Sequence, residues 1–289
     1  MSDFWGIWGK PYVDLERLVD LDELTSLDEE ITRGLVEIEP APTGGSLKWM
    51  GVTAPSANAD PYVDYMHVIE AMTEDDLREL VSLADDPGAL RERPLRTLRF
   101  GDETDNPLNL VQARFLAYRH RVYFPWEVTF HFLENQRWED KNSGAGKTWS
   151  AEAQEIFPRT VRFLRSLPFR EIGRCLLFGL RANQHAPLHR DAEPGRTETL
   201  GHAISLCPRG DKRLYLATPD ESELSVVRAR AYWFNDMDWH GVLADPFFRY
   251  SIRIDGVFLP SFLADLRRGR QGPPSPRAGV PGRDRRHGA

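Results

Sequence analysis

The chain has 289 residues, 41% hydrophobic and 28% charged, a composition typical of a soluble globular protein with one large or two small domains. Its formal net charge of -7 gives no general case for nucleic-acid binding. No apolar run approaches the ~20 residues of a membrane span. The two cysteines, Cys175 and Cys207, are too few for a disulfide scaffold, and we predict buried thiols. The opening residues lack a signal-peptide pattern, so we expect a cytoplasmic protein.

Residues 1–148 predict a mixed, mainly helical region that packs on the rest of the chain. Leucines recur at helical spacing over residues 15–24, and Thr73 is a good N-cap for a helix that ends near residue 84. Residues 109–124 fit a helix or a long strand. Residues 124–133 alternate between apolar and polar, which predicts a half-buried strand. On its less apolar face lies His131, a candidate substrate contact or a hydrogen-bonded surface histidine.

The segment KNSGAGKTW, which begins at Lys141, resembles the end of a phosphate-binding loop. The full pattern requires a glycine where Lys141 stands and a strand immediately before it. The preceding residues are a polar loop, so we predict no phosphate site here.

The segment after residue 149 predicts a helix followed only by strands. Ser150 is a helix cap, and the regular helix is expected to begin at Pro158, because proline suits a first turn. Short apolar runs then follow one another between polar turns, which is typical of a β-sandwich or barrel. Residues 149–266 therefore form the predicted β core. Residues 267–289 are rich in Arg, Gly and Pro and are expected to form a disordered basic tail.

A candidate metal centre is formed by His189, Asp191 and His240. A His and an Asp two residues apart on an extended segment point to the same side, and a later strand brings the second His. Two imidazoles and one carboxylate form the facial triad of non-haem Fe(II) oxygenases. The alternative is that His189 and Asp191 lie in a surface turn and that His240 is a core histidine. His185 is a rival ligand, but Pro187 argues against a helical pair with His189, and a place at the pocket lip suits it better.

One strand near the end of the chain carries polar residues on a face that a barrel would bury. Arg249, Ser251 and Arg253 alternate with apolar residues there. Buried arginines are costly unless they meet anions, and arginine suits a two-point grip on a carboxylate. A dicarboxylate cosubstrate would supply such an anion. The alternative is that these arginines pair with acids of the protein, for which the candidates are Asp236, Asp238 and Asp255.

These motifs together resemble a known superfamily. Residues Phe157 to Pro260 resemble the Fe(II)/2-oxoglutarate-dependent oxygenases, and look most like the aspartyl/asparaginyl β-hydroxylase branch. The resemblance lies in FPRTVRFLRSLP, APLHRDAEP, GHAISLCP, ARAYWFNDMDWHGV and FRYSIRIDGVFLP, in that order. It implies an α+β protein with a mainly β core, a double-stranded β-helix (a cupin-like jelly roll) with flanking helices.

The resemblance also implies roles for single residues. Iron would be held by His189, Asp191 and His240, and Arg249 with Ser251 would hold the far carboxylate of 2-oxoglutarate. The same comparison places His202 near a histidine that lies beside the cosubstrate; the alternative is a hydrogen-bonded core histidine. Asp191 departs from the best-known aspartyl hydroxylases, which lack a carboxylate ligand at that position. This departure puts an aspartyl substrate in doubt and argues against halogenation.

The implied activity is a dioxygenase that uses Fe(II), 2-oxoglutarate and O2. It would hydroxylate an unactivated C–H bond of an amino acid, free or in a peptide, and release succinate and CO2. The candidate substrate contacts are Arg181, His131, His185 and Arg253. We expect a small-molecule or peptide substrate and neither a nucleic-acid nor a membrane partner; the sequence does not indicate an oligomeric state. The alternatives are an oxygenase of a natural-product pathway, a non-oxygenase metal cupin (an isomerase or lyase) and a binding module.

Overall fold

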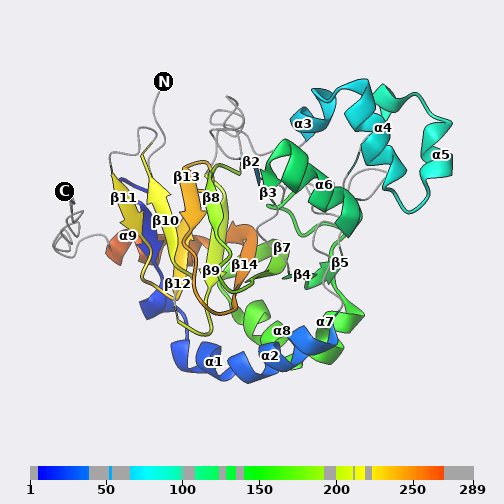
Figure 1. Ribbon diagram of the computed structural model, residues 1–289. Helices are drawn as coiled ribbons and strands as arrows, with labels where there is room; N and C mark the ends of the chain where they lie inside the picture. Colours follow the sequence, from blue (N-terminus) through cyan, green and yellow to red (C-terminus); the bar gives the residue numbers. More distant parts are fainter. Residues whose placement is uncertain are drawn as a thin grey trace.

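The structure is a computed structural model of the whole chain. It describes residues 6–38, 52–53, 66–98, 100, 108–123, 128–134, 140–191, 200–210, 212–218 and 223–269. Its centre consists of two antiparallel sheets that face each other (Figure 1). Eight of their strands form the barrel: β7 (Phe169–Leu180), β8 (Ala186–His189), β9 (His202–Leu206), β10 (Leu214–Ala217), β11 (Leu224–Val226), β12 (Ala231–Phe234), β13 (Trp239–Val242) and β14 (Arg249–Phe258).

The order of these strands identifies the fold. One sheet contains β12-β9-β14-β7 and the other contains β11-β10-β13-β8. Apart from the β10–β11 hairpin, each strand lies in the opposite sheet from the strand before it. This is the wrapping of a double-stranded β-helix, or jelly roll. The prediction of an α+β protein with a cupin-like β core is therefore confirmed.

The N-terminal region supplies both outer strands of the larger sheet. Strand β1 (Tyr12–Asp14) pairs with β12, and β4 (Val128–His131) pairs with β7. The larger sheet thus has six strands, in the order β1-β12-β9-β14-β7-β4. Two small ribbons complete the strands: β2 (Val52–Thr53) with β3 (Val122–Tyr123), and β5 (Leu133–Glu134) with β6 (Thr148–Trp149).

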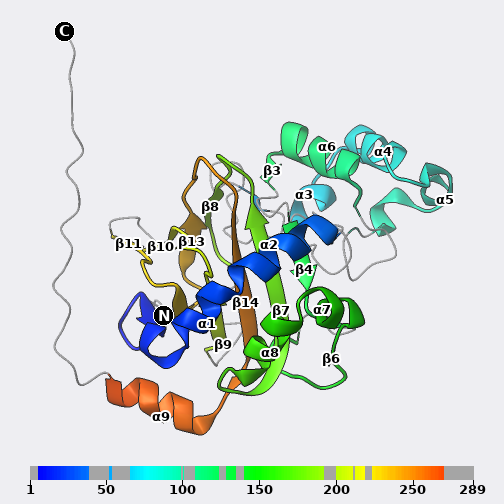
Figure 2. The same cartoon turned by 90° about the horizontal axis from the view of Figure 1, so that it is seen from below.

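Helices cover the outer face of the larger sheet (Figure 2). They are α1 (Leu21–Ser26), α2 (Asp28–Glu37), α7 (Ala151–Ile156), α8 (Pro158–Ser166) and α9 (Pro260–Arg268). Their apolar residues share one core with Leu177 of β7 and with Ile252 and Ile254 of β14. The alternate residues of β7, among them Leu176 and Phe178, belong to a second core between the two sheets. Burial on both faces makes β7 and β14 the rigid centre of the molecule.

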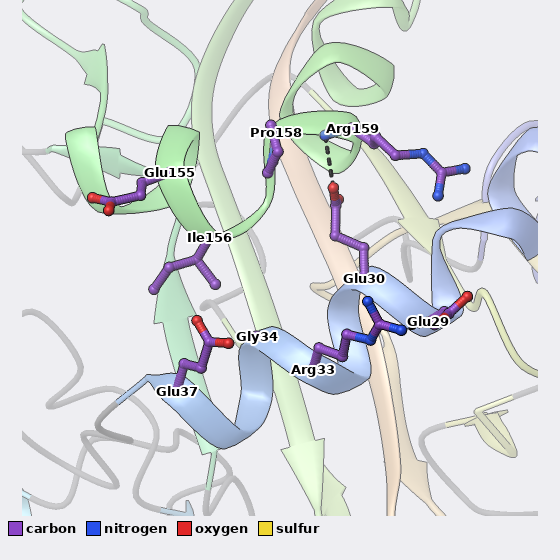
Figure 3. A pocket seen from close by; sticks show the side chains of 9 residues that line it. All are labelled: Glu29, Glu30, Arg33, Gly34, Glu37, Glu155, Ile156, Pro158 and Arg159. Atoms are coloured by element: carbon purple, nitrogen blue, oxygen red, sulfur yellow. Dashed lines mark hydrogen bonds and ion pairs between the residues drawn. The ribbon is translucent and has the colours of Figure 1, made fainter.

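A surface hollow between α2 and the α7–α8 turn is lined mostly by charged residues (Figure 3). Glu30 reaches across it and accepts hydrogen bonds from the backbone N–H groups of Arg159 (2.9 Å) and Thr160 (2.7 Å). Helix α8 has no N-cap side chain of its own, so Glu30 satisfies its first free N–H groups. The hollow lies on the helical side of the larger sheet, outside the barrel.

A separate group of helices stands at one side of the barrel (Figure 1). It contains α3 (Met66–Glu70), α4 (Glu74–Ser82), α5 (Pro87–Arg91) and α6 (Leu110–His120), with an apolar core of its own. The predicted cap is confirmed, because the Thr73 hydroxyl accepts from the backbone N–H of Asp76 (3.1 Å). Of the segment 109–124, residues 110–120 form a helix and 122–123 a short strand, and residue 124 lies outside the described residues. Over the described ranges, no helix is long and apolar enough to cross a lipid bilayer.

Three predicted elements differ from the observed ones. The helix expected over residues 15–24 is split, because Asp20 caps a new helix by accepting from the N–H of Glu23 (2.9 Å). The expected strand 124–133 is regular only from Val128 to His131, and residues 124–127 lie outside the described residues. The predicted disordered tail also lies outside them beyond Gly269, while Arg267 and Arg268 end α9. The predicted helix start at Pro158 is confirmed.

The packing of α2 on the α7–α8 turn leads to a prediction. A Cβ on Gly34 would lie 2.1 Å from the Phe157 ring, so Gly34→Ala should lower the free energy of unfolding by about 2 kcal/mol through overpacking. Gly88→Ala is the matched control, because a Cβ there has no neighbour closer than 3.4 Å. It should be neutral or stabilising by up to about 1 kcal/mol, through helix propensity alone. Urea unfolding measures both; equal stabilities would contradict the packing.

Candidate metal centre

Three side chains converge inside the barrel at the end where β8 stops and β13 begins, which we call the mouth. His189 and His240 are direct partners in the pairing of β8 with β13, and their rings lie 4.3 Å apart. The Asp191 Oδ1 atom lies 3.4 Å from Nε2 of His189 and 3.3 Å from Nε2 of His240. The ligand atoms of all three lie within 4.8 Å of one another. In the part of the chain that the structure describes, this is the one such group.

The orientation of His240 suits a metal ligand. Its Nδ1 lies 2.8 Å from the backbone carbonyl oxygen of Asp238, so Nδ1 carries the proton and Nε2 keeps a free lone pair. The ring also packs edge-on against Phe234 at 5.0 Å. Both imidazoles are buried, whereas the side chain of Asp191 is 41% exposed. The carboxylate therefore forms the solvent-facing side of the group.

Asp191 is held by its backbone and by charge. Its N–H donates to the carbonyl oxygen of Asp236 (3.0 Å). Burial raises the pKa of Asp191, but the two imidazoles, with His240 foremost, outweigh burial and hold that pKa well below its ordinary value. The carboxylate is thus an anion at neutral pH. Between the ligands, the Arg190 guanidinium lies 4.7 Å over the Trp239 ring, which ties this bend to the start of β13.

The inward face of β14 bears the polar residues that the sequence predicts for it. Tyr250, Ile252 and Ile254 lie in the helix-side core, so the alternate residues face the barrel. Arg249 donates to the carbonyl oxygens of Lys212 (2.6 Å) and Leu243 (2.5 Å) and pairs with Asp245 at 3.3 Å. These contacts fix the guanidinium on the barrel side of the strand.

Ser251 is the residue of this face whose surroundings most clearly indicate a bound ligand. Its side chain is 2% exposed, and its hydroxyl has no hydrogen-bond partner among the described residues. A buried hydroxyl without a partner is costly. A polar group of a bound molecule between Arg249 and the metal ligands would satisfy it.

Arg253 meets acids of the protein instead of an open site. It donates to Asp255 through Nε (3.0 Å) and to Asp236 through an Nη atom (2.9 Å). Asp255 also accepts from Arg174 (2.7 Å), and Asp236 from Lys141. Burial lowers the pKa of Arg253, but Asp255 and Asp236 outweigh it, so the guanidinium keeps its charge. The alternative of protein partners is the observed one for Arg253, and this correction removes it from the candidate substrate contacts.

Lys212 is a further cation at the barrel interior. Its Nζ lies 5.4 Å from the centroid of the Phe178 ring, which belongs to the core between the sheets. Burial lowers the pKa of Lys212 to about 8. Among the charges that act on it are those of Asp191 and Arg249. An ammonium and a guanidinium whose charges act on each other favour an anionic ligand nearby.

The other predicted site residues do not join the metal group. The His202 ring stacks on Phe258 at 4.7 Å, and its Nδ1 accepts from the Phe258 N–H (3.1 Å). The ring points to the helical side of the larger sheet. This agrees with the alternative of a hydrogen-bonded core histidine and argues against a role beside the cosubstrate. Arg181 and His185 are exposed in the turn between β7 and β8, at the far end of β8 from His189. Both lie away from the mouth.

His131 lies beside the barrel interior. It pairs across strands with Leu176, which is also the partner of Arg253. Burial, with a smaller contribution from Arg174, lowers the pKa of His131 to about 4. The imidazole is therefore neutral at physiological pH. Its role as a substrate contact stays a prediction.

The lysines of the KNSGAGK segment contact groups of the protein. Lys147 donates to the backbone carbonyl oxygens of Gly173 (2.7 Å) and Asp140, and Lys141 to Asp236. Both ammonium groups thus serve the protein itself. Lys141, Lys212 and the backbone N–H of Gly6, which donates to the Asp238 carboxylate (2.6 Å), were not among the predicted site residues. Their contacts join segments that are far apart in the chain, and no local sequence pattern predicts such contacts.

Comparisons with known proteins give the following. No family model and no curated protein matches the chain. Among solved structures, an oxidoreductase of the 2OG-Fe(II) oxygenase family from Burkholderia pseudomallei is 12% identical over 44% of this chain and 66% of that chain, just under two thirds, with a TM-score of 0.29. A Pseudomonas putida prolyl-4-hydroxylase is 11% identical over 39% of this chain and 69% of that chain, with a TM-score of 0.25. An RmlC-like cupin from Desulfovibrio desulfuricans is 15% identical over 29% of this chain and 73% of that chain, with a TM-score of 0.21.

The buried imidazole of His131 leads to a pH prediction. Its pKa of about 4 lies below the ordinary 6.5, so the unfolded chain binds the proton more tightly. Stability from the neutral imidazole is present above pH 6.5 and is lost as the pH falls toward 4. The stability advantage of the unaltered protein over His131→Asn should therefore shrink by about 2 kcal/mol between pH 7 and pH 4.5. Urea midpoints at both pH values measure this difference, and a constant difference would contradict it.

Proposed function

We propose that the protein is an Fe(II)- and 2-oxoglutarate-dependent oxygenase that hydroxylates an unactivated C–H bond of an amino acid, free or within a peptide. The observation that carries the proposal is the meeting of His189, Asp191 and His240 at the mouth of a double-stranded β-helix. Two imidazoles and one carboxylate on one face suit Fe(II) and leave coordination positions open for other ligands. When bound, iron, 2-oxoglutarate and O2 would supply an oxidation in which one oxygen atom goes to succinate, with release of CO2, and the other to the hydroxylated product.

The residues of the chain fit these groups. Nε2 of His240 is free to bind iron because Nδ1 is held by the Asp238 carbonyl. On the inward face of β14, Ser251 offers a buried hydroxyl without a partner in the described chain. Arg249 is oriented by two backbone carbonyls and offers a guanidinium suited to a carboxylate.

Two cations serve the far carboxylate of the cosubstrate in this proposal. Arg249 holds it through hydrogen bonds, and Lys212, whose carbonyl oxygen accepts from Arg249 just before β10, adds charge. The low exposure of the Arg249 side chain excludes water, which strengthens its interaction with the carboxylate. The remaining residues at the mouth would orient the substrate, and Asp191, the exposed ligand, faces the side from which it arrives.

The aspartyl/asparaginyl β-hydroxylase branch is the finer part of the proposal. It rests on the order of the sequence motifs. The carboxylate of Asp191 departs from that branch and favours an amino-acid or peptide substrate other than an aspartyl residue. A cytoplasmic location and the absence of a nucleic-acid partner also stay predictions.

The first test is succinate formation by anaerobically purified protein supplied with Fe(II), 2-oxoglutarate and O2, with and without amino acids and peptides. Succinate should require all three additions, and His240→Ala should abolish it while the metal-free variant keeps a cooperative thermal transition. Iron binding without succinate would instead favour a metal cupin that is an isomerase or lyase. Full turnover by His240→Ala would refute the metal centre.

Ser251→Ala and Arg249→Met separate binding from folding within this test. Ser251 has no described hydrogen-bond partner, so its loss should leave stability unchanged and raise the KM for 2-oxoglutarate about 5-fold. Arg249→Met should raise that KM about 10- to 100-fold, as expected for a charged hydrogen bond. An unchanged KM in both variants would place the cosubstrate elsewhere.

The pKa of Lys212 predicts how cosubstrate binding depends on pH. The ammonium is charged below pH 8 and neutral above it, and the charges that act on it are those of Arg249, Arg253, Asp191 and Cys207. Because only the charged form attracts a carboxylate, the KM for 2-oxoglutarate should rise as the pH passes from 7 to 9. Lys212→Met should show a higher KM at pH 7 and lose the rise. A rise that persists in Lys212→Met would assign it to another group.

A further inference from the structure

Two of the three metal-group residues are held by one short segment. Residues Asn235–Asp238, the joining segment, connect β12 to β13. The backbone carbonyl of Asp236 accepts from the N–H of Asp191 (3.0 Å), and that of Asp238 lies 2.8 Å from Nδ1 of His240. The position of the joining segment therefore fixes the positions of Asp191 and His240.

The side chain of Asp236 anchors the joining segment from two directions. Arg253 of β14 donates to Oδ2 at 2.9 Å, and Lys141 donates to the same atom from a loop 95 residues earlier in the chain. The carboxylate is 8% exposed and the lysine 23%. Arg253 divides its donors between Asp236 and Asp255. Among the described residues, Lys141 is therefore the ion-pair partner that serves Asp236 alone.

Lys141 is itself held in a fixed place. Its backbone carbonyl packs on Gly173 of β7 so closely that a Cβ there would lie 2.3 Å from the oxygen. The pairing of β7 with β14 shifts register at this glycine, which marks a β-bulge. From the other end of the loop, Lys147 donates to the Gly173 carbonyl at 2.7 Å. The bulge and the loop together present Lys141 to the barrel.

We infer that Lys141 is a positioning residue of the metal centre: its ion pair with Asp236 fixes the joining segment and thereby the place of Asp191. The inference rests on the proposed metal site and adds a residue to it. Asp191 is the most exposed of the three ligands, so it depends more than the buried imidazoles on its backbone anchor. Groups that orient metal ligands from behind typically contribute about 10- to 100-fold to metal affinity.

The test measures metal affinity instead of turnover. Co(II) is titrated anaerobically into the full-length protein, and its visible absorption reports both occupancy and ligand geometry. Lys141→Met should weaken the Kd for Co(II) about 10-fold and alter the spectrum. Lys141→Arg, which keeps the charge, should restore most of the affinity. Lys10→Met removes a charge at an exposed lysine and should leave the Kd unchanged.

A double-mutant cycle establishes whether Lys141 acts through Asp236. Asp236→Asn keeps the backbone carbonyl that holds Asp191 and removes the partner charge. If the pair acts as a unit, the double variant should bind Co(II) about as weakly as Asp236→Asn alone. Independent, multiplicative losses would overturn the inference, as would an unchanged Kd in Lys141→Met. Thermal midpoints of the metal-free variants show that each is folded.

The same titration distinguishes the inference from the proposed function. If the unaltered protein binds no Co(II) and no Fe(II), the proposed metal site itself is refuted. If the unaltered protein binds and Lys141→Met binds equally well with the same spectrum, the metal site stands and the role of Lys141 is refuted. If Lys141→Arg is as weak as Lys141→Met, charge alone does not hold the segment, and the ion-pair account is refuted.

Discussion

Charge inside the barrel is the constraint on which the rest of this structure depends. Strand β14 turns Arg253 and Asp255 toward the interior, where an unpaired ion is strongly destabilising. Pairing them requires Arg174 from the neighbouring strand, Asp236 from the joining segment and, through Asp236, a lysine from a distant loop. The paths of these segments follow from that requirement. The metal centre then lies at the edge of a fully paired network, so its ligands rest on a rigid base.

Much of the fold and the core of the site follow from local rules of the chain. The short apolar runs after residue 168 predict strands, and their spacing predicts a sandwich or barrel. The alternation along β14 predicts which residues face inward, and the structure shows Ile252 and Ile254 on the opposite face. The His189–Asp191 spacing predicts a shared direction in the same way. These inferences succeed because each depends on backbone periodicity over a few residues.

Other features depend on contacts between distant segments and are not visible in the sequence. Neighbouring residues of a strand face opposite sides, so an error of one residue in the expected register reverses the direction of a side chain. His202 accordingly stacks on Phe258 instead of facing the barrel. The split between α1 and the residues before it depends on a cap at Asp20 that competes with a continuous leucine pattern. Lys141 and Lys212 reach the barrel from loops whose sequences are merely polar. Only the folded chain shows which acids and cations meet.

The hydrogen bond between the backbone N–H of Gly6 and the carboxylate of Asp238, at 2.6 Å, joins residues 232 positions apart. On a ribosome, the first of these residues is made long before the second, and the strand that pairs along β7 is completed later still. Strands β1 and β4 are made before their partners β12 and β7, so their edges stay unpaired until the partners follow. Unpaired strand edges are where chains associate wrongly. Ligand-binding competence should therefore arise in a single late step, when Gly6 and Arg253 of β14 both contact the joining segment.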